Sequence, residues 1–175
     1  NMLIWRRSAK RLEAEIIRDT ILATSGTLDT TQFGKGTLDE RSAKRSIYFT
    51  VKRSRLIPLL KLFDAPDAMQ GIATREQSTV APQALALLNS PLIREYATKF
   101  ATRVRPNTEI SNEQVITATY EIALSRPATA SEIQTMNQFI TSQTEMRGGD
   151  SNAQQLAVRD FCHLVLCMNE FIYID

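Results

Sequence analysis

The single histidine of the chain, His163, is the residue best suited to acid–base or nucleophilic chemistry. A Cys–His or Ser–His–acid centre would have to use it. Its neighbour Cys162 would point about 100° away around a helix, so the two residues cannot form a dyad unaided. Asp160 lies three residues earlier and could orient the imidazole ring. A lone histidine on the core-facing side of a helix is, however, more often structural, so the sequence shows no catalytic constellation and assigns no catalytic residue.

Polar residues around a long loop, predicted over 64–79, form the best candidate ligand-binding group. Arg75 carries a planar guanidinium that suits carboxylate or sulfate groups. Buried amides need hydrogen-bond partners, so side chains such as Gln83 should bond to this loop or face a cleft. The alternative is that Arg75 pairs with Asp64 or Asp67 and only pins the loop. The full candidate set is Arg53, Asp64, Arg75, Thr79, Gln83 and Asn89.

Metal and cofactor chemistry has little support in the sequence. Zinc sites need several Cys or His residues at recurring spacing, and covalent haem attachment needs Cys-x-x-Cys-His, of which Cys162-His163 lacks the first cysteine. The glycine-rich stretch 33–36 lacks the pattern of a phosphate-binding loop. Cys162 and Cys167 lie five residues apart, and on a helix their side chains diverge too far to bridge. We therefore expect no metal and no cofactor in this chain, and two free thiols that are both buried.

Helices are expected to position most of these residues. Apolar spacing predicts a helix over 2–25, with a core stripe that includes Ile16, Thr20 and Ala23 and is widened by Ile17 and Ile21. Further helices are predicted over 55–63, over 82–88 and from residue 91 to about 103. The last of these has Ser90 as its N-cap.

Three capping boxes open the last three predicted helices. They begin at Ser111, Thr129 and Ser151, each followed three residues later by Gln or Glu. The segment 46–52 is the one convincing strand candidate, with 171–174 as its partner. The sequence therefore predicts a mainly α domain of about six or seven helices with at most a short two-stranded β element.

Composition limits the class of protein. At 175 residues, with 43% hydrophobic and 23% charged residues, the chain is typical of one globular domain over 1–175. No apolar run approaches the roughly 20 residues of a membrane span. The net charge is +2, but residues 1–60 hold 12 Lys and Arg against 6 Asp and Glu. This basic half could bind a polyanion, or it could be a solvated surface that pairs with the acidic half; no nucleic-acid motif accompanies it.

Ordered blocks along the chain carry a family resemblance. They include Leu-Phe-Asp-Ala-Pro-Asp at 62–67, Thr-Val-Ala-Pro-Gln-Ala-Leu-Ala-Leu-Leu-Asn-Ser-Pro at 79–91 and Met-Asn-Glu-Phe-Ile-Tyr-Ile-Asp at 168–175, with others at 11–19, 44–48, 51–55, 124–127 and 160–163. Together they resemble the C-terminal half of the planctomycete-specific domain of unknown function that closes large exported proteins. The resemblance implies an exported, periplasmic or cell-surface setting and a larger chain N-terminal to residue 1. A haem could belong to a cytochrome-c-type domain upstream, but the resemblance brings no reaction with it.

Three functional hypotheses follow from the sequence. The first is a non-catalytic helical module that docks on the N-terminal part of its own larger chain. The second is part of an enzyme acting on polysaccharides or sulfated glycans, with a site shared between both halves. The third is polyanion binding by the basic N-terminal half.

Overall fold

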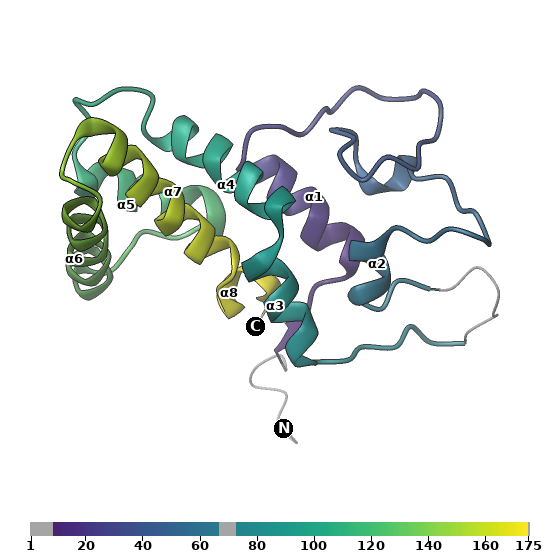
Figure 1. Ribbon diagram of the computed structural model, residues 1–175. Coiled ribbons are helices and arrows are strands. Elements are labelled where there is room, and N and C mark those ends of the chain that lie inside the picture. The colour runs from purple at the N-terminus through teal and green to yellow at the C-terminus, as the bar shows by residue number, and fades with distance from the viewer. Residues whose placement is uncertain (1–8, 67–72, 175) are drawn as a thin grey trace, which may run out of the picture.

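The computed structural model describes residues 9–66 and 73–174 and is mainly helical, as the sequence predicts (Figure 1). Six of its helices have seven residues or more. The elements are α1 (Ala14–Thr24), the 3-10 turn η1 (Ser46–Tyr48), α2 (Pro58–Leu62), α3 (Ala81–Asn89), α4 (Pro91–Val104), α5 (Asn112–Leu124), α6 (Ala130–Met146), α7 (Ser151–Leu166) and α8 (Asn169–Ile172). Within the described residues, no helix is both long and apolar enough to cross a membrane.

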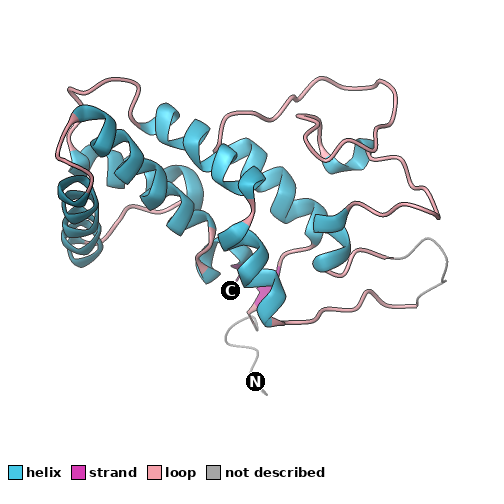
Figure 2. Cartoon of the chain, viewed as in Figure 1, coloured by secondary structure: helices cyan, strands magenta, loops and turns pink. Residues whose placement is uncertain are grey.

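The later helices form a bundle, and the earlier ones form a looser, loop-rich half. α7 packs against α4, α5 and α6 around a core that includes Phe100, Ile116, Ile140 and Phe161, all fully buried. A second core joins α1 to α3, α4 and the end of α7. Figure 2 shows that the long irregular segments lie together, on the side of the molecule where α1 and α2 are found.

Local capping chemistry fixes the starts of α4, α5 and α6 where the sequence places them. Ser90 accepts a hydrogen bond from the backbone of α4, and the capping boxes at Ser111 and Thr129 are both formed. The predicted box at Ser151 is wrong by one residue. Asp150 caps α7 instead, because its carboxylate accepts a 2.6 Å hydrogen bond from the Ala153 amide and aspartate is as good an N-cap as serine.

The predicted strand over 46–52 is not formed. Residues 46–48 make a 3-10 turn, and the segment keeps only single-residue bridges, such as Thr37 to Phe49. The sheet that does form pairs β1 (Lys10–Arg11) antiparallel with β2 (Tyr173–Ile174). Of the tail strand predicted over 171–174, only Tyr173 and Ile174 form a strand, because Phe171 and Ile172 belong to α8, and the partner of this strand is the segment before α1.

The predicted first helix is shorter than expected, and its core face differs. Described residues 9–13 are extended and the helix begins at Ala14, while residues 1–8 lie outside the described part. Ile17 and Ile21 are buried, but Ile16 is 44% exposed, Thr20 is half-buried and Ala23 is exposed. The centre of the predicted stripe thus lies on the outer side of α1, and only the two isoleucines that widen it face the core.

An ion-pair network closes the bundle where α5 ends and α6 begins. The Arg126 guanidinium pairs with Glu132 of α6 at 2.7 Å and with Glu170 of α8 at 2.5 Å, and it lies over the Tyr120 ring. Hydrogen bonds from Arg126 and from the Thr129 backbone and hydroxyl lower the pKa of Glu132 to about 2. This one arginine links three helices.

Candidate functional site

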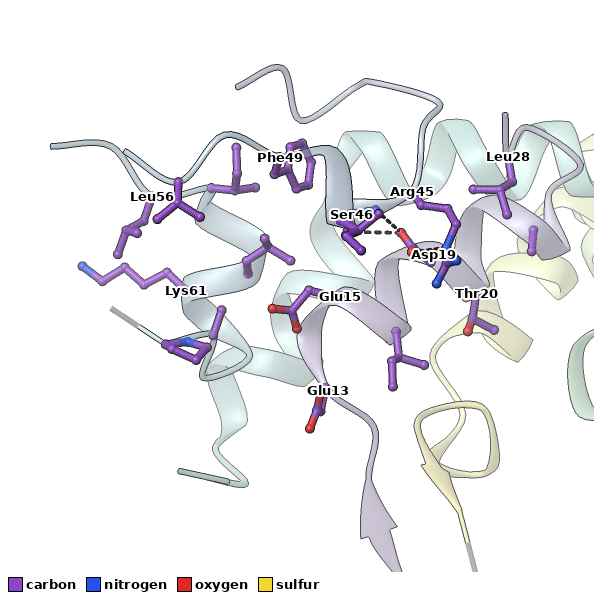
Figure 3. A pocket seen from close by; sticks show the side chains of 18 of the residues that line it. Glu13, Glu15, Asp19, Thr20, Leu28, Arg45, Ser46, Phe49, Leu56 and Lys61 are labelled. Atoms are coloured by element: carbon purple, nitrogen blue, oxygen red, sulfur yellow. Dashed lines mark hydrogen bonds and ion pairs between the residues drawn. The ribbon is translucent and has the colours of Figure 1, made fainter. Parts of the chain in front are cut away.

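A groove of about 1140 Å³ runs along the outer side of α1. Figure 3 shows Glu13, Glu15, Asp19 and Thr20 along its α1 side, with Ser46 and Phe49 on one wall and Leu56 and Lys61 toward α2. Its apolar lining includes Ile16, Ala23, Leu28, Ile47, Val51, Leu56, Leu60, Ile122 and Ala123.

Arg18 builds the first wall of the groove. Its side chain is buried, and its guanidinium donates hydrogen bonds to the backbone carbonyls of Lys44 (3.0 Å), Glu40 (3.3 Å) and Ser42. It also lies 4.5 Å from the centre of the Phe49 ring. Because this single cation satisfies several carbonyls of an irregular segment, residues 40–49 are held against α1 without a sheet. Burial lowers the pKa of Arg18 from its usual value, although an arginine stays charged in proteins.

Asp19, the next residue of α1, fixes the same segment from the groove side. Its carboxylate accepts hydrogen bonds from the backbone N–H and the hydroxyl of Ser46, each at 2.7 Å. Arg45 approaches the same carboxylate at 3.5 Å. Asp19 therefore anchors the start of η1, which explains why a segment of strand-forming residues turns here instead.

Arg11 and Asp64, which do not line the groove, hold the 64–79 loop in a similar way. The Arg11 guanidinium is buried, pairs with the Asp64 carboxylate at 2.6 Å and donates to the Phe63 and Ser78 carbonyls. Asp64 also accepts from the Ser78 N–H at 2.7 Å. The buried Gln83 amide then donates to the Ser78 hydroxyl at 3.1 Å. The two ends of the 64–79 loop are therefore tied together by a continuous polar network.

Arg75 lines the groove but pairs differently from the sequence expectation. It donates to the carboxylates of Glu13 at 3.2 Å and Glu15 at 2.5 Å, beside the start of α1. Asp64 is not its partner, because Arg11 already occupies that carboxylate. Asp67 lies outside the described residues.

The remaining sequence candidates are placed apart from this pair. The Thr79 hydroxyl lies 3.1 Å from the Tyr173 hydroxyl. Arg53 is exposed in the segment before α2, and Asn89 is exposed at the end of α3. The structure thus brings Asp64 and Gln83 together through Ser78, and puts only Arg75 of the six candidates in the groove.

The comparisons with known proteins bear on the segments that form this groove. The sequence model of the family PSD1, described as "Protein of unknown function (DUF1553)", matches residues 1–140. The chain belongs to this family. The match includes α1, the irregular segments and α2, and so covers every wall of the groove. No curated protein and no solved structure matches the chain.

The histidine and the cysteines of this PSD1 chain are built into the bundle. His163 is buried and its Nε2 lies 3.0 Å from the Leu87 carbonyl, which ties α7 to α3. Both cysteines are free, as predicted, but only Cys162 is buried as expected, because Cys167 at the C-cap of α7 is half-buried. Burial raises the pKa of Cys162, and it raises that of the half-buried Cys167 to about 11, so neither is activated as a thiolate. In the part of the chain that the structure describes, no three His, Cys, Asp or Glu side chains could share a metal ion.

Proposed function

We propose that the chain is a non-catalytic helical module that docks on another part of its own larger, exported polypeptide, and that the groove beside α1 is the docking surface. The observation that carries this proposal is that apolar side chains of α1 and of the neighbouring irregular segment line the groove and are exposed to solvent. The occupant is the part that the planctomycete domain resemblance places N-terminal to residue 1.

The groove lining contains several exposed apolar side chains that share one cavity. Ile47 is 77% exposed, Val51 is 81% exposed, and both line the same cavity as Ile16 of α1. Scattered exposed apolar side chains are ordinary, but a contiguous apolar patch is typical of an interaction site. Fully burying such a side chain contributes about 1.5–3 kcal/mol, so these three could supply several kcal/mol to docking.

The walls of the groove are held in place before any partner arrives. Arg18 and Asp19 fix one wall, and Arg75 is fixed by Glu13 and Glu15. A preorganised surface avoids part of the ordering cost of binding. This arrangement favours recognition of a polypeptide segment over a role as a flexible linker.

Polyanion binding by the basic half has less support in the geometry. Arg11, Arg41 and Arg45 each pair with a carboxylate, and the Lys44 ammonium donates to the Phe33 carbonyl. These engaged residues all lie in 1–45, whereas Lys52, Arg53 and Arg55 of the same basic half are exposed and form no ion pair within the described residues, so polyanion binding stays a prediction. The shared-site enzyme hypothesis stays a prediction, with Arg75 as its one candidate in the groove.

Thiol labelling tests the docking proposal. Ile47→Cys and Val51→Cys place reporters in the groove, and Met146→Cys, at a residue 76% exposed at the end of α6, is the matched control outside it. The unsubstituted chain, with one buried and one half-buried thiol, sets the background. We expect both groove reporters to react with a maleimide quickly in the 175-residue chain and slowly in the longer polypeptide, while Met146→Cys reacts alike in both. Equal rates for the groove reporters in the two proteins would refute docking at this surface.

A further inference from the structure

Some charged side chains at the rim of the groove have a partner within the described chain, and others have none. Its carboxylates already have cationic partners inside the chain: Glu13 and Glu15 pair with Arg75, and Asp19 pairs with Arg45. The groove-lining cation Arg103 is also engaged, because it donates to the carbonyls of Ala23 and Thr24 that end α1, each at 2.8 Å.

Three groove-lining cations differ from these: Lys61 of α2, which is exposed and forms no ion pair within the described residues, and a neighbouring pair, Lys52 and Arg55. Lys52 and Arg55 line the groove, both are exposed, and neither forms an ion pair within the described residues. A tight turn sets them side by side, with the Arg55 N–H donating to the Lys52 carbonyl at 3.1 Å. Lys52 directly follows Val51, the most exposed apolar residue of the lining. The free charge of the rim is therefore positive and lies next to the apolar surface.

A segment that covers Val51 would also take water away from these two cations. Removing water from a charge costs free energy unless an opposite charge replaces it, and like charges across an interface cost several kcal/mol. A carboxylate on the incoming segment would offset that cost and fix its orientation, whereas a lysine or arginine there would be repelled. An uncharged apolar segment would leave the cations without compensation.

We infer that the segment that fills the groove is a polypeptide with apolar side chains and acidic residues, and that its carboxylates pair with Lys52 and Arg55. This inference rests on the proposed docking function and adds the chemistry of the partner. It also predicts that acidic residues of the occupant lie at the end of the groove formed by residues 51–57.

Charge reversal in the longer polypeptide tests the inference, with Ile47→Cys as the reporter. Lys52→Glu with Arg55→Glu should speed labelling of the reporter by at least about tenfold, equivalent to about 1.4 kcal/mol of docking free energy. The matched control, Lys35→Glu with Arg53→Glu, makes the same charge change at exposed residues that do not line the groove, and should leave protection intact. The same substitutions in the 175-residue chain correct for any direct effect on the thiol. Unchanged melting of those shorter variants shows that the fold is kept.

The outcomes separate the two proposals. If the reporter is protected in the longer polypeptide and stays protected after reversal at 52 and 55, the acidic-partner inference is wrong while docking stands. If the unreversed longer polypeptide shows no protection, docking and the inference both fail. If heparin, a sulfated glycan, protects the reporter in the 175-residue chain and the longer polypeptide does not, the groove takes a free polyanion and the inference is overturned.

Discussion

Replacing Arg18 by methionine should detach the wall of the groove that residues 40–49 form. Methionine keeps an apolar stem of similar length inside the core but removes every donor. The carbonyls of Glu40, Ser42 and Lys44 then lose their shared partner. A hydrogen bond to a charged group contributes about 1.5–3 kcal/mol, so the full set would exceed 4 kcal/mol if the carbonyls stayed buried.

However, residues 40–49 can move away from α1 in the variant, and their carbonyls then form hydrogen bonds with water. We therefore expect a net loss of about 3 kcal/mol in the free energy of unfolding, the lower end of the cost of removing one partner from a buried charged network. For a chain of this size that corresponds to a fall of roughly 6–12 °C in melting temperature. Urea denaturation measures the first quantity and a thermal scan the second.

Hydrogen exchange locates the effect, and Arg41→Met is the matched control. Arg41 belongs to the same segment but forms an exposed ion pair with Glu95, so its loss should change the melting temperature little. In Arg18→Met, amides of residues 40–49 should exchange faster while those of α7 change much less. A melting temperature equal to that of Arg41→Met would refute the role given to Arg18.

Two further arginines should respond in opposite directions. Arg126→Met should lower the free energy of unfolding by roughly 1 kcal/mol at pH 7, since the network is about one-third exposed and partly screened by solvent. Because the pKa of Glu132 is lowered from 4.5 to about 2 in the folded chain, its contribution is complete above pH 4.5 and is lost as the pH falls toward 2. The difference from wild type should shrink over that range in urea titrations, and a constant difference would contradict this account. Arg105→Met should keep or raise the melting temperature, because Arg105 is buried, burial lowers its pKa, its Nη1 has no hydrogen-bond partner among the described residues, and its Nη2 makes only a long 3.5 Å hydrogen bond to the Thr108 carbonyl. A clear drop in calorimetry would show that this guanidinium has a stabilising partner.

Features set by neighbouring residues were predictable from the sequence. The capping boxes at Ser111 and Thr129 need only side chains three residues apart, and both form as expected. The same holds for Ser90 before α4 and for the free thiols of Cys162 in α7 and Cys167 at its C-cap. The mainly α class follows from these local signals.

Features that depend on distant partners were not predictable. The strand-like composition of 46–52 gave way because Arg18 and Asp19, nearly thirty residues earlier, offer its backbone better partners than a lone strand could. α1 carries apolar residues around more of its circumference than the core covers. The packing of the other helices decides which of them are buried, and it leaves Ile16 exposed. The partner of Arg75 likewise depends on Arg11 having taken Asp64.

The most direct test of the docking surface is hydrogen exchange across residues 45–57 in unsubstituted protein, compared between the 175-residue chain and the longer polypeptide. These residues include Ile47 and Val51 of the groove lining, and α6 provides an internal control because it does not contribute to the groove. Docking predicts exchange slowed by at least about tenfold over 45–57 in the longer polypeptide, equivalent to about 1.4 kcal/mol, with α6 unchanged. The same exchange rates in both proteins would contradict the claim that this groove is a docking surface.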